Sequence, residues 1–121
     1  MAMSVQDLVQ EARKHIHEID PDTAEQHLGE PRTVLIDVRE PAELEAGRLP
    51  GAIHIPRGLL EFHIGSCREL ADPSVPVLVY CRSGARSALA AETLQRMGYS
   101  NVSNIAGGFE AWVAGGKALD E

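Results

Sequence analysis

The first stretch of the chain carries apolar residues at helical spacing. They recur three or four positions apart, at Val5, Leu8, Val9, Ala12 and Ile16. Residues at this spacing lie on one face of an α-helix, so residues 1–15 are predicted to form an amphipathic helix. Its apolar face packs either on the rest of the molecule or on a partner protein, and the pattern leaves both open.

A second helix is predicted to begin at Asp20-Pro21. An acidic cap followed by a proline in the first turn is typical of a helix start, and Gly29 marks the end of the segment. Beyond it, helical spacing gives way to short apolar runs at residues 34–38, 52–56, 75–80 and 102–105. Runs of this kind predict strands that are buried on both faces, as in a parallel sheet.

Further helices are predicted between and after these strands, over residues 41–47, 60–70, 84–97 and 109–113. In two of them one face is marked by apolar residues: Leu60, Ile64 and Cys67, and then Ala90, Leu94 and Met97. Strands that alternate with helices predict an α/β fold around a largely parallel sheet.

Composition narrows the class of protein. The 121 residues suit one domain, and 44% hydrophobic and 24% charged residues are typical of a chain that builds one core. The formal net charge of −7 argues against a general affinity for nucleic acid or for an anionic membrane. Any site for an anion must therefore be local.

The two cysteines, Cys67 and Cys81, limit the chemistry further. Neither lies at metal-site spacing from another cysteine or from a histidine, so we expect no disulfide scaffold, no metal site and no cofactor. No apolar stretch is long enough for a spanning helix, and no export signal is evident. These features predict a cytoplasmic protein.

Reactive residues follow the predicted strands. Asp37 and Arg39 come at the end of one strand, Arg57 follows the next, and Cys81 follows the third directly. In an open parallel sheet, ligands bind beyond the carboxyl ends of the strands. We therefore expect the active site at this edge.

The segment from Cys81 to Ser87 joins a buried strand to a helix through small residues. Successive backbone N–H groups in such a bend can curl around an anion, and Gly84 permits the left-handed backbone that a tight cradle needs. A helix N-terminus and flanking arginines favour the thiolate form of a cysteine, which is the nucleophile. The expected substrate-binding residues are Arg82, Ser83, Gly84, Ala85, Arg86 and Ser87, with Cys81 as the catalytic residue.

The segment Cys81-Arg82-Ser83-Gly84-Ala85-Arg86 resembles the six-residue active-site loop of the rhodanese family, Cys-Arg-x-Gly-x-Arg or Thr. Three other segments resemble that family in the same order: residues 35–44 around Asp-Val-Arg, residues 47–56 around Gly-Ala-x-x-Ile-Pro, and residues 107–112 with Gly-Gly and Trp. The resemblance covers about residues 16–115, and it departs from the family at Arg48-Leu49, where His-Ile is usual.

The resemblance implies a three-layer rhodanese-like fold for residues 16–121, with a mostly parallel sheet of about five strands and helices on both faces. It leaves residues 1–15 as a helical extension. It also implies a ping-pong reaction, in which Cys81 takes a sulfane sulfur from thiosulfate, a small anion, or from a persulfide donor. The Cys81 persulfide then passes this sulfur to cyanide, a thiol or a protein thiol. Within the family, Arg82 and Arg86 would help bind the donor, while Asp37 and Arg39 look structural.

Two other functions stay open at this point. A phosphatase or arsenate reductase of the same fold would use a cysteine loop around phosphate, but its arginine follows five intervening residues, whereas four separate Cys81 from Arg86. Ser87 stands where that arginine would be. A binding module that has lost catalysis is the other alternative.

Several side chains also have a structural interpretation. Asp37, Arg39 and Arg57 are expected to support the site, but Arg39 and Arg57 could simply be solvated. For Arg57, the position after a strand is the only indication of a supporting role. One loop arginine is expected to face the anion while the other points to solvent or to an acidic partner. Cys67 is interpreted as a core-facing residue, with a resolving thiol for Cys81 as the alternative. The oligomeric state is not predicted.

Overall fold

A computed structural model describes residues 2–120 of the chain. Its centre is a sheet of five strands in the order β1-β5-β4-β2-β3, and every pairing in it is parallel. The strands are β1 (His17–Ile19), β2 (Val34–Asp37), β3 (Ile53–His54), β4 (Val77–Tyr80) and β5 (Val102–Ile105). The predicted α/β fold with a parallel sheet of about five strands is confirmed.

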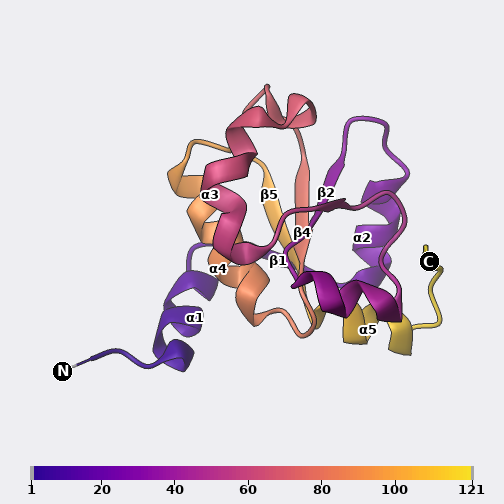
Figure 1. Cartoon of the computed structure of the whole chain (residues 1–121), viewed down its shortest axis with the longest axis horizontal. Coiled ribbons are helices and arrows are strands. Elements are labelled where there is room, and N and C mark those ends of the chain that lie inside the picture. Colours follow the sequence, from indigo (N-terminus) through magenta and orange to yellow (C-terminus); the bar gives the residue numbers. More distant parts are fainter. Residues whose placement is uncertain (1, 121) are drawn as a thin grey trace.

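Helices cover both faces of the sheet (Figure 1). One side carries α1 (Val5–Arg13), α3 (Leu60–His63) and α4 (Ala85–Arg96), and the other carries α2 (Pro21–Leu28) and α5 (Gly108–Ala114). The protein has two hydrophobic core clusters, one on each face of the sheet, and alternate residues of a strand point into them. Ile36 lies in the cluster under α3 and α4, while Leu35 lies in the cluster under α2 and α5. This is why the strand segments read as continuous apolar runs.

Local signals placed several helix ends correctly. The Asp20 side chain caps α2 by accepting a hydrogen bond from Thr23 N–H at 2.8 Å. The helix predicted over residues 1–15 forms as α1, which spans Val5–Arg13, and part of its apolar face packs on the rest of the molecule. Val9 and Ala12 are buried, whereas Val5 and Leu8 are exposed, because α1 packs on α4 along one edge of its apolar face.

Strand β1 was not predicted from the sequence. Two of its three residues are exposed, because β1 is the outermost strand and has β5 on one side alone in the described part of the chain. An edge strand of three residues carries no apolar run, and its pairing depends on a partner that is distant in sequence. The segment nevertheless lies next to the site described below.

The helix predicted over residues 60–70 is wrong as a continuous element. Only α3 is α-helical, and it is flanked by 3₁₀ turns: η2 (Arg57–Leu59), η3 (Ile64–Ser66) and η4 (Arg68–Leu70). The break falls at Gly65, a poor helix former, and at Cys67, whose backbone is extended. Leu60 and Ile64 are buried as predicted.

Two smaller predictions also need correction. Met97 is exposed rather than part of the buried stripe formed by Ala90 and Leu94, because it lies beyond the last turn of α4. The helix predicted over residues 41–47 is a 3₁₀ helix, η1 (Pro41–Ala46). In the described part of the chain, no helix is both long and apolar enough to cross a bilayer.

Candidate active site around Cys81

Cys81 directly follows β4, at the carboxyl ends of the parallel strands, and is 1% exposed. Three groups donate hydrogen bonds to its sulfur: the N–H of Gly84 at 3.1 Å, the N–H of Ser87 at 3.4 Å and the hydroxyl of Ser87 at 3.3 Å. Donors converging on one sulfur atom stabilise negative charge on it. The loop therefore surrounds the position where a thiolate would form.

Other amides of the same loop have no partner. Within residues 2–120, the N–H groups of Arg82, Ser83, Ala85 and Arg86 donate no hydrogen bond. Gly84 adopts the left-handed backbone conformation expected of it, with φ of +107°, which allows the chain to turn from strand to helix around the sulfur. The bend thus offers free donors for an anion beside Cys81.

Helix α5 holds the loop from its outer side. Phe109 N–H donates to the Cys81 carbonyl at 2.8 Å, and Glu110 N–H donates to the Arg82 carbonyl at 3.0 Å. A Cβ atom on Gly108 would lie 2.4 Å from the Cys81 carbonyl oxygen, so only glycine permits this approach. Gly108, in the family-like segment 107–112, is therefore what allows α5 to anchor the cysteine loop.

Both loop arginines are held by glutamates. Arg86 forms a two-point ion pair with Glu43, at 2.7 and 2.9 Å, and Arg82 pairs with Glu110 at 3.0 Å in an exposed position. Both arginines therefore have an acidic partner, whereas the sequence predicted that at least one would face the anion and that the other would point to solvent or to an acidic partner. Both guanidinium groups therefore share their charge with a carboxylate.

The Arg86 guanidinium lowers the pKa of Glu43 to about 2, from an ordinary value of 4.5. Because the folded-state pKa lies below the unfolded one, the pair stabilises the fold above about pH 4.5, and this contribution disappears as the pH falls through about 2. We expect Glu43→Gln to lower the free energy of unfolding by about 1 kcal/mol at pH 7, a modest value because the pair is partly exposed.

Urea unfolding of Glu43→Gln and of the unsubstituted protein between pH 2 and pH 7 tests this. The difference between them is expected to shrink toward zero at the acidic end. Glu45→Gln is the matched control, because Glu45 lies exposed on the same turn. A difference for Glu43→Gln that stays constant down to pH 2 would contradict the assignment.

Asp37 and Arg39 form a buried pair beside the loop. Arg39 is 1% exposed, and its Nε and Nη2 atoms donate to the Asp37 carboxylate at 2.8–3.1 Å. The Tyr80 hydroxyl donates to the same carboxylate at 2.6 Å, and burial raises the pKa of Tyr80. The alternative that Arg39 is solvated is therefore wrong.

Arg39 also holds the 3₁₀ turn η1. Its guanidinium donates to the carbonyls of Glu43 at 3.2 Å and Gly47 at 2.9 Å, and it stacks over the Phe109 ring at 4.4 Å. It thereby positions the turn that carries Glu43, which in turn binds Arg86. The sequence placed Asp37 and Arg39 near the site but did not identify Glu43 or Tyr80 as their partners.

Arg57 is not brought to the cysteine loop. It donates to the Glu61 carboxylate at 3.0 Å and to the Thr93 hydroxyl at 3.1 Å, so it joins α3 to α4. Cys67 packs against the core cluster and is a free thiol, and burial raises its pKa. Among residues 2–120, no three side chains of His, Cys, Asp or Glu gather to hold a metal ion.

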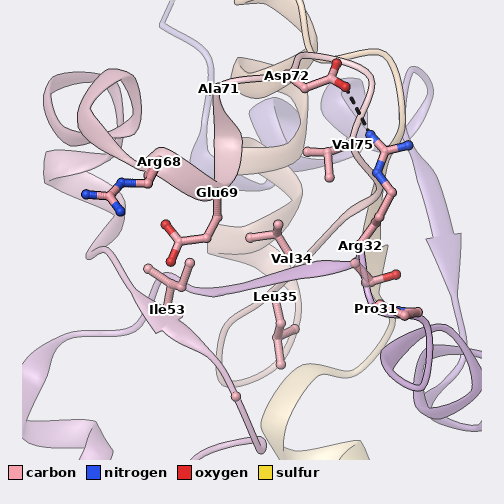
Figure 2. Close-up of a pocket in the computed structure, with 12 residues that line it drawn as sticks. Pro31, Arg32, Val34, Leu35, Ile53, Arg68, Glu69, Ala71, Asp72 and Val75 are labelled. Atoms are coloured by element: carbon pink, nitrogen blue, oxygen red, sulfur yellow. Dashed lines mark hydrogen bonds and ion pairs between the residues drawn. The ribbon is translucent and has the colours of Figure 1, made fainter.

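One cavity lies near the carboxyl ends of the strands, and another lies near their amino ends. One, of about 340 Å³, adjoins the cysteine loop and is lined by Arg39, Glu43, Ala46, Arg82, Phe109 and Glu110. The other, of about 490 Å³, lies at the start of the strands, where the exposed Arg32–Asp72 pair borders it (Figure 2). Of these two cavities, the one of about 340 Å³ includes a residue of the loop, Arg82.

Comparisons with known proteins agree with this geometry. A family model described as a rhodanese-like domain matches residues 20–115. A protein of Allochromatium vinosum named as a sulfurtransferase is 37% identical over 102 residues, which cover 84% of this chain and 92% of that protein.

Two solved structures are also similar. A protein of unknown function from Rhodopseudomonas palustris, described as a possible tyrosine phosphatase, is 34% identical with a TM-score of 0.86, covering 99% of this chain and 96% of that one. A homodimeric polysulfide-sulfur transferase from Wolinella succinogenes is 34% identical with a TM-score of 0.80, covering 94% of this chain and 85% of that one.

Proposed function

This chain belongs to the rhodanese-like domain family, and on that premise we propose that it is a sulfurtransferase that carries sulfur on Cys81. The observation that carries the proposal is the set of donors on the Cys81 sulfur, from Gly84 N–H and from the N–H and hydroxyl of Ser87. The sulfurtransferase relative, matched over 92% of its length, supports the same reaction class.

In the proposed reaction the Cys81 thiolate attacks the sulfane sulfur of a donor such as thiosulfate. A new sulfur–sulfur bond forms on Cys81 while the donor's own sulfur–sulfur bond breaks, and the electron pair leaves on sulfite. The product is a negatively charged persulfide. An acceptor, either cyanide or the thiolate of a small molecule or protein, then attacks the outer sulfur and restores the Cys81 thiolate.

The loop contributes electrostatic stabilisation to both halves of this cycle. The free amides of Arg82, Ser83, Ala85 and Arg86 are available to the outer sulfur of the persulfide, whose charge lies one bond beyond the thiolate. Arg86 and Arg82 attract the anionic donor to the rim. No cofactor takes part in this scheme, and the cytoplasmic location stays a prediction.

A phosphatase is the rival that the Rhodopseudomonas palustris structure raises. Against it stands the size of the loop, since four residues separate Cys81 from Arg86 and Ser87 occupies the position of a phosphatase arginine. The Ser87 hydroxyl points at the cysteine sulfur instead. The slight exposure of Cys81 also favours transfer of a single sulfur atom over attack on a bulky phosphate ester.

We expect the purified protein to form thiocyanate from thiosulfate and cyanide and to leave p-nitrophenyl phosphate intact. Both reactions are measured on the same preparation, by thiocyanate absorbance with iron(III) and by release of p-nitrophenol. Hydrolysis of the phosphate ester without sulfur transfer would establish the phosphatase. Neither reaction, together with no sulfur bound to Cys81, would establish the binding module.

A further inference from the structure

Asn104 connects the cysteine loop to β1, the outermost strand of the sheet. It lies in β5 with 0% exposure, and its Nδ2 atom donates to two oxygens: the Gly84 carbonyl at 3.1 Å and Glu18 Oε2 at 3.0 Å. Glu18 belongs to β1, before residue 20, where the family match begins. A buried side chain thus joins the loop to β1, the outermost strand of the sheet.

The Gly84 carbonyl controls the direction of a loop amide. In a trans peptide the C=O and the following N–H point in opposite directions. The Gly84 carbonyl accepts from Asn104 Nδ2 at 3.1 Å and from Ala88 N–H, in the first turn of α4, at 3.1 Å. Together these two donors direct the Ala85 N–H to the other side of that peptide plane, and Ala85 N–H is among the loop amides without a partner. The Gly84 N–H itself donates to the Cys81 sulfur.

Glu18 keeps the Asn104 amide in this orientation. The Asn104 Oδ1 atom has no partner among the described residues, so both hydrogen bonds that orient the side chain come from Nδ2. If Glu18 stopped accepting, only the bond to Gly84 would hold the amide. Glu18 is in turn paired with Arg13 at 3.6 Å, at the end of α1.

We propose that Glu18 and Asn104 are positioning residues of the sulfur-binding loop, and that residues 4–19 support this loop through them. The inference rests on the proposed role of Cys81 as the sulfur carrier. The packing of α1 on α4, the helix that begins at Ala85, supports it. A Cβ atom built on Gly84 would lie 3.5 Å from Arg13 Nη2, so the end of α1 reaches the loop itself.

The test compares alkylation of Cys81 by iodoacetate, an anion, and by iodoacetamide, its neutral analogue, at one pH. The ratio of the two rate constants, followed on the peptide that carries Cys81, reports how well the loop attracts an anion. General loosening of the fold raises both rates together. A misdirected amide lowers the ratio.

We expect Glu18→Ala to have a ratio about threefold lower than Glu18→Gln, because glutamine can still accept from Asn104 and alanine cannot. Both variants remove the carboxylate charge, so the difference between them reports the loss of the acceptor at residue 18 and not the loss of its charge. Asn104→Leu, which keeps a side chain branched at Cγ and removes the donor, is expected to lower the ratio about threefold or more relative to the unsubstituted protein. Glu11→Ala, an exposed acidic residue of α1, is the matched control and leaves the ratio unchanged.

Equal ratios for Glu18→Ala and Glu18→Gln, or an unchanged ratio in Asn104→Leu, would overturn the positioning role. Alkylation needs neither sulfur donor nor acceptor, so that result would leave the proposed function standing. Conversely, a protein that binds no sulfur but shows the expected ratios would refute the function alone. A Cys81 that reacts with neither reagent would overturn both.

Discussion

The Cys81→Ser variant is expected to take up no sulfur from thiosulfate and to lose sulfur transfer by a factor of more than about 1000. A serine hydroxyl is not ionised at neutral pH and is a poor nucleophile without an adjacent base, so the donor's sulfur–sulfur bond is not attacked. The surrounding donors from Gly84 and Ser87 cannot compensate, because they stabilise a charge that the hydroxyl does not carry. Intact-mass spectrometry after incubation with thiosulfate measures the result directly.

The Cys67→Ser variant is the matched control for this experiment. Cys67 packs against the core cluster near α3, and burial, with a smaller contribution from Glu69, raises the pKa of its thiol. We expect this variant to gain one sulfur atom, as the unsubstituted protein does. Sulfur uptake that persists in Cys81→Ser and is lost in Cys67→Ser would show that Cys67 carries the sulfur, and it would refute the mechanism.

Arg39→Leu is expected to lower the free energy of unfolding by about 3–5 kcal/mol, the largest effect on stability among the substitutions considered. The substitution leaves the Asp37 carboxylate, which has 0% exposure, without its cationic partner. It also removes the donors to the carbonyls of Glu43 and Gly47. A buried carbonyl group that loses its hydrogen-bond donor destabilises the fold. Urea unfolding at pH 7 measures the change.

The double variant Asp37→Leu/Arg39→Leu separates the buried charge from the lost packing. It removes both ions, so its loss of stability is expected to be smaller than the sum of the single losses by about 1–3 kcal/mol. Additive losses would show that the pair does not interact energetically. The Tyr80 hydroxyl also accepts from Leu49 N–H at 3.1 Å in the unsubstituted protein, so we expect it to keep one partner in the double variant.

The sequence was sufficient for the cysteine loop because the information there is local. A buried apolar run, a cysteine, small residues with Gly84 among them, and an alanine-rich helix follow one another within residues 75–97. The donors to the sulfur come from the same few residues, since Gly84 and Ser87 lie three and six positions from Cys81. The parallel sheet was also predictable, because strands buried on both faces differ in pattern from exposed ones.

The partners of the loop could be known only from the folded chain. Glu43 is 43 positions from Arg86, and Glu18 is 86 positions from Asn104, and neither pair has a recognisable spacing. Such contacts depend on the order and register of the strands: the order β1-β5-β4 places β1 next to β5, and the register pairs Glu18 directly with Asn104. Short-range patterns report which residues are buried and where elements begin and end, whereas contacts across the sheet are set by how the elements pack.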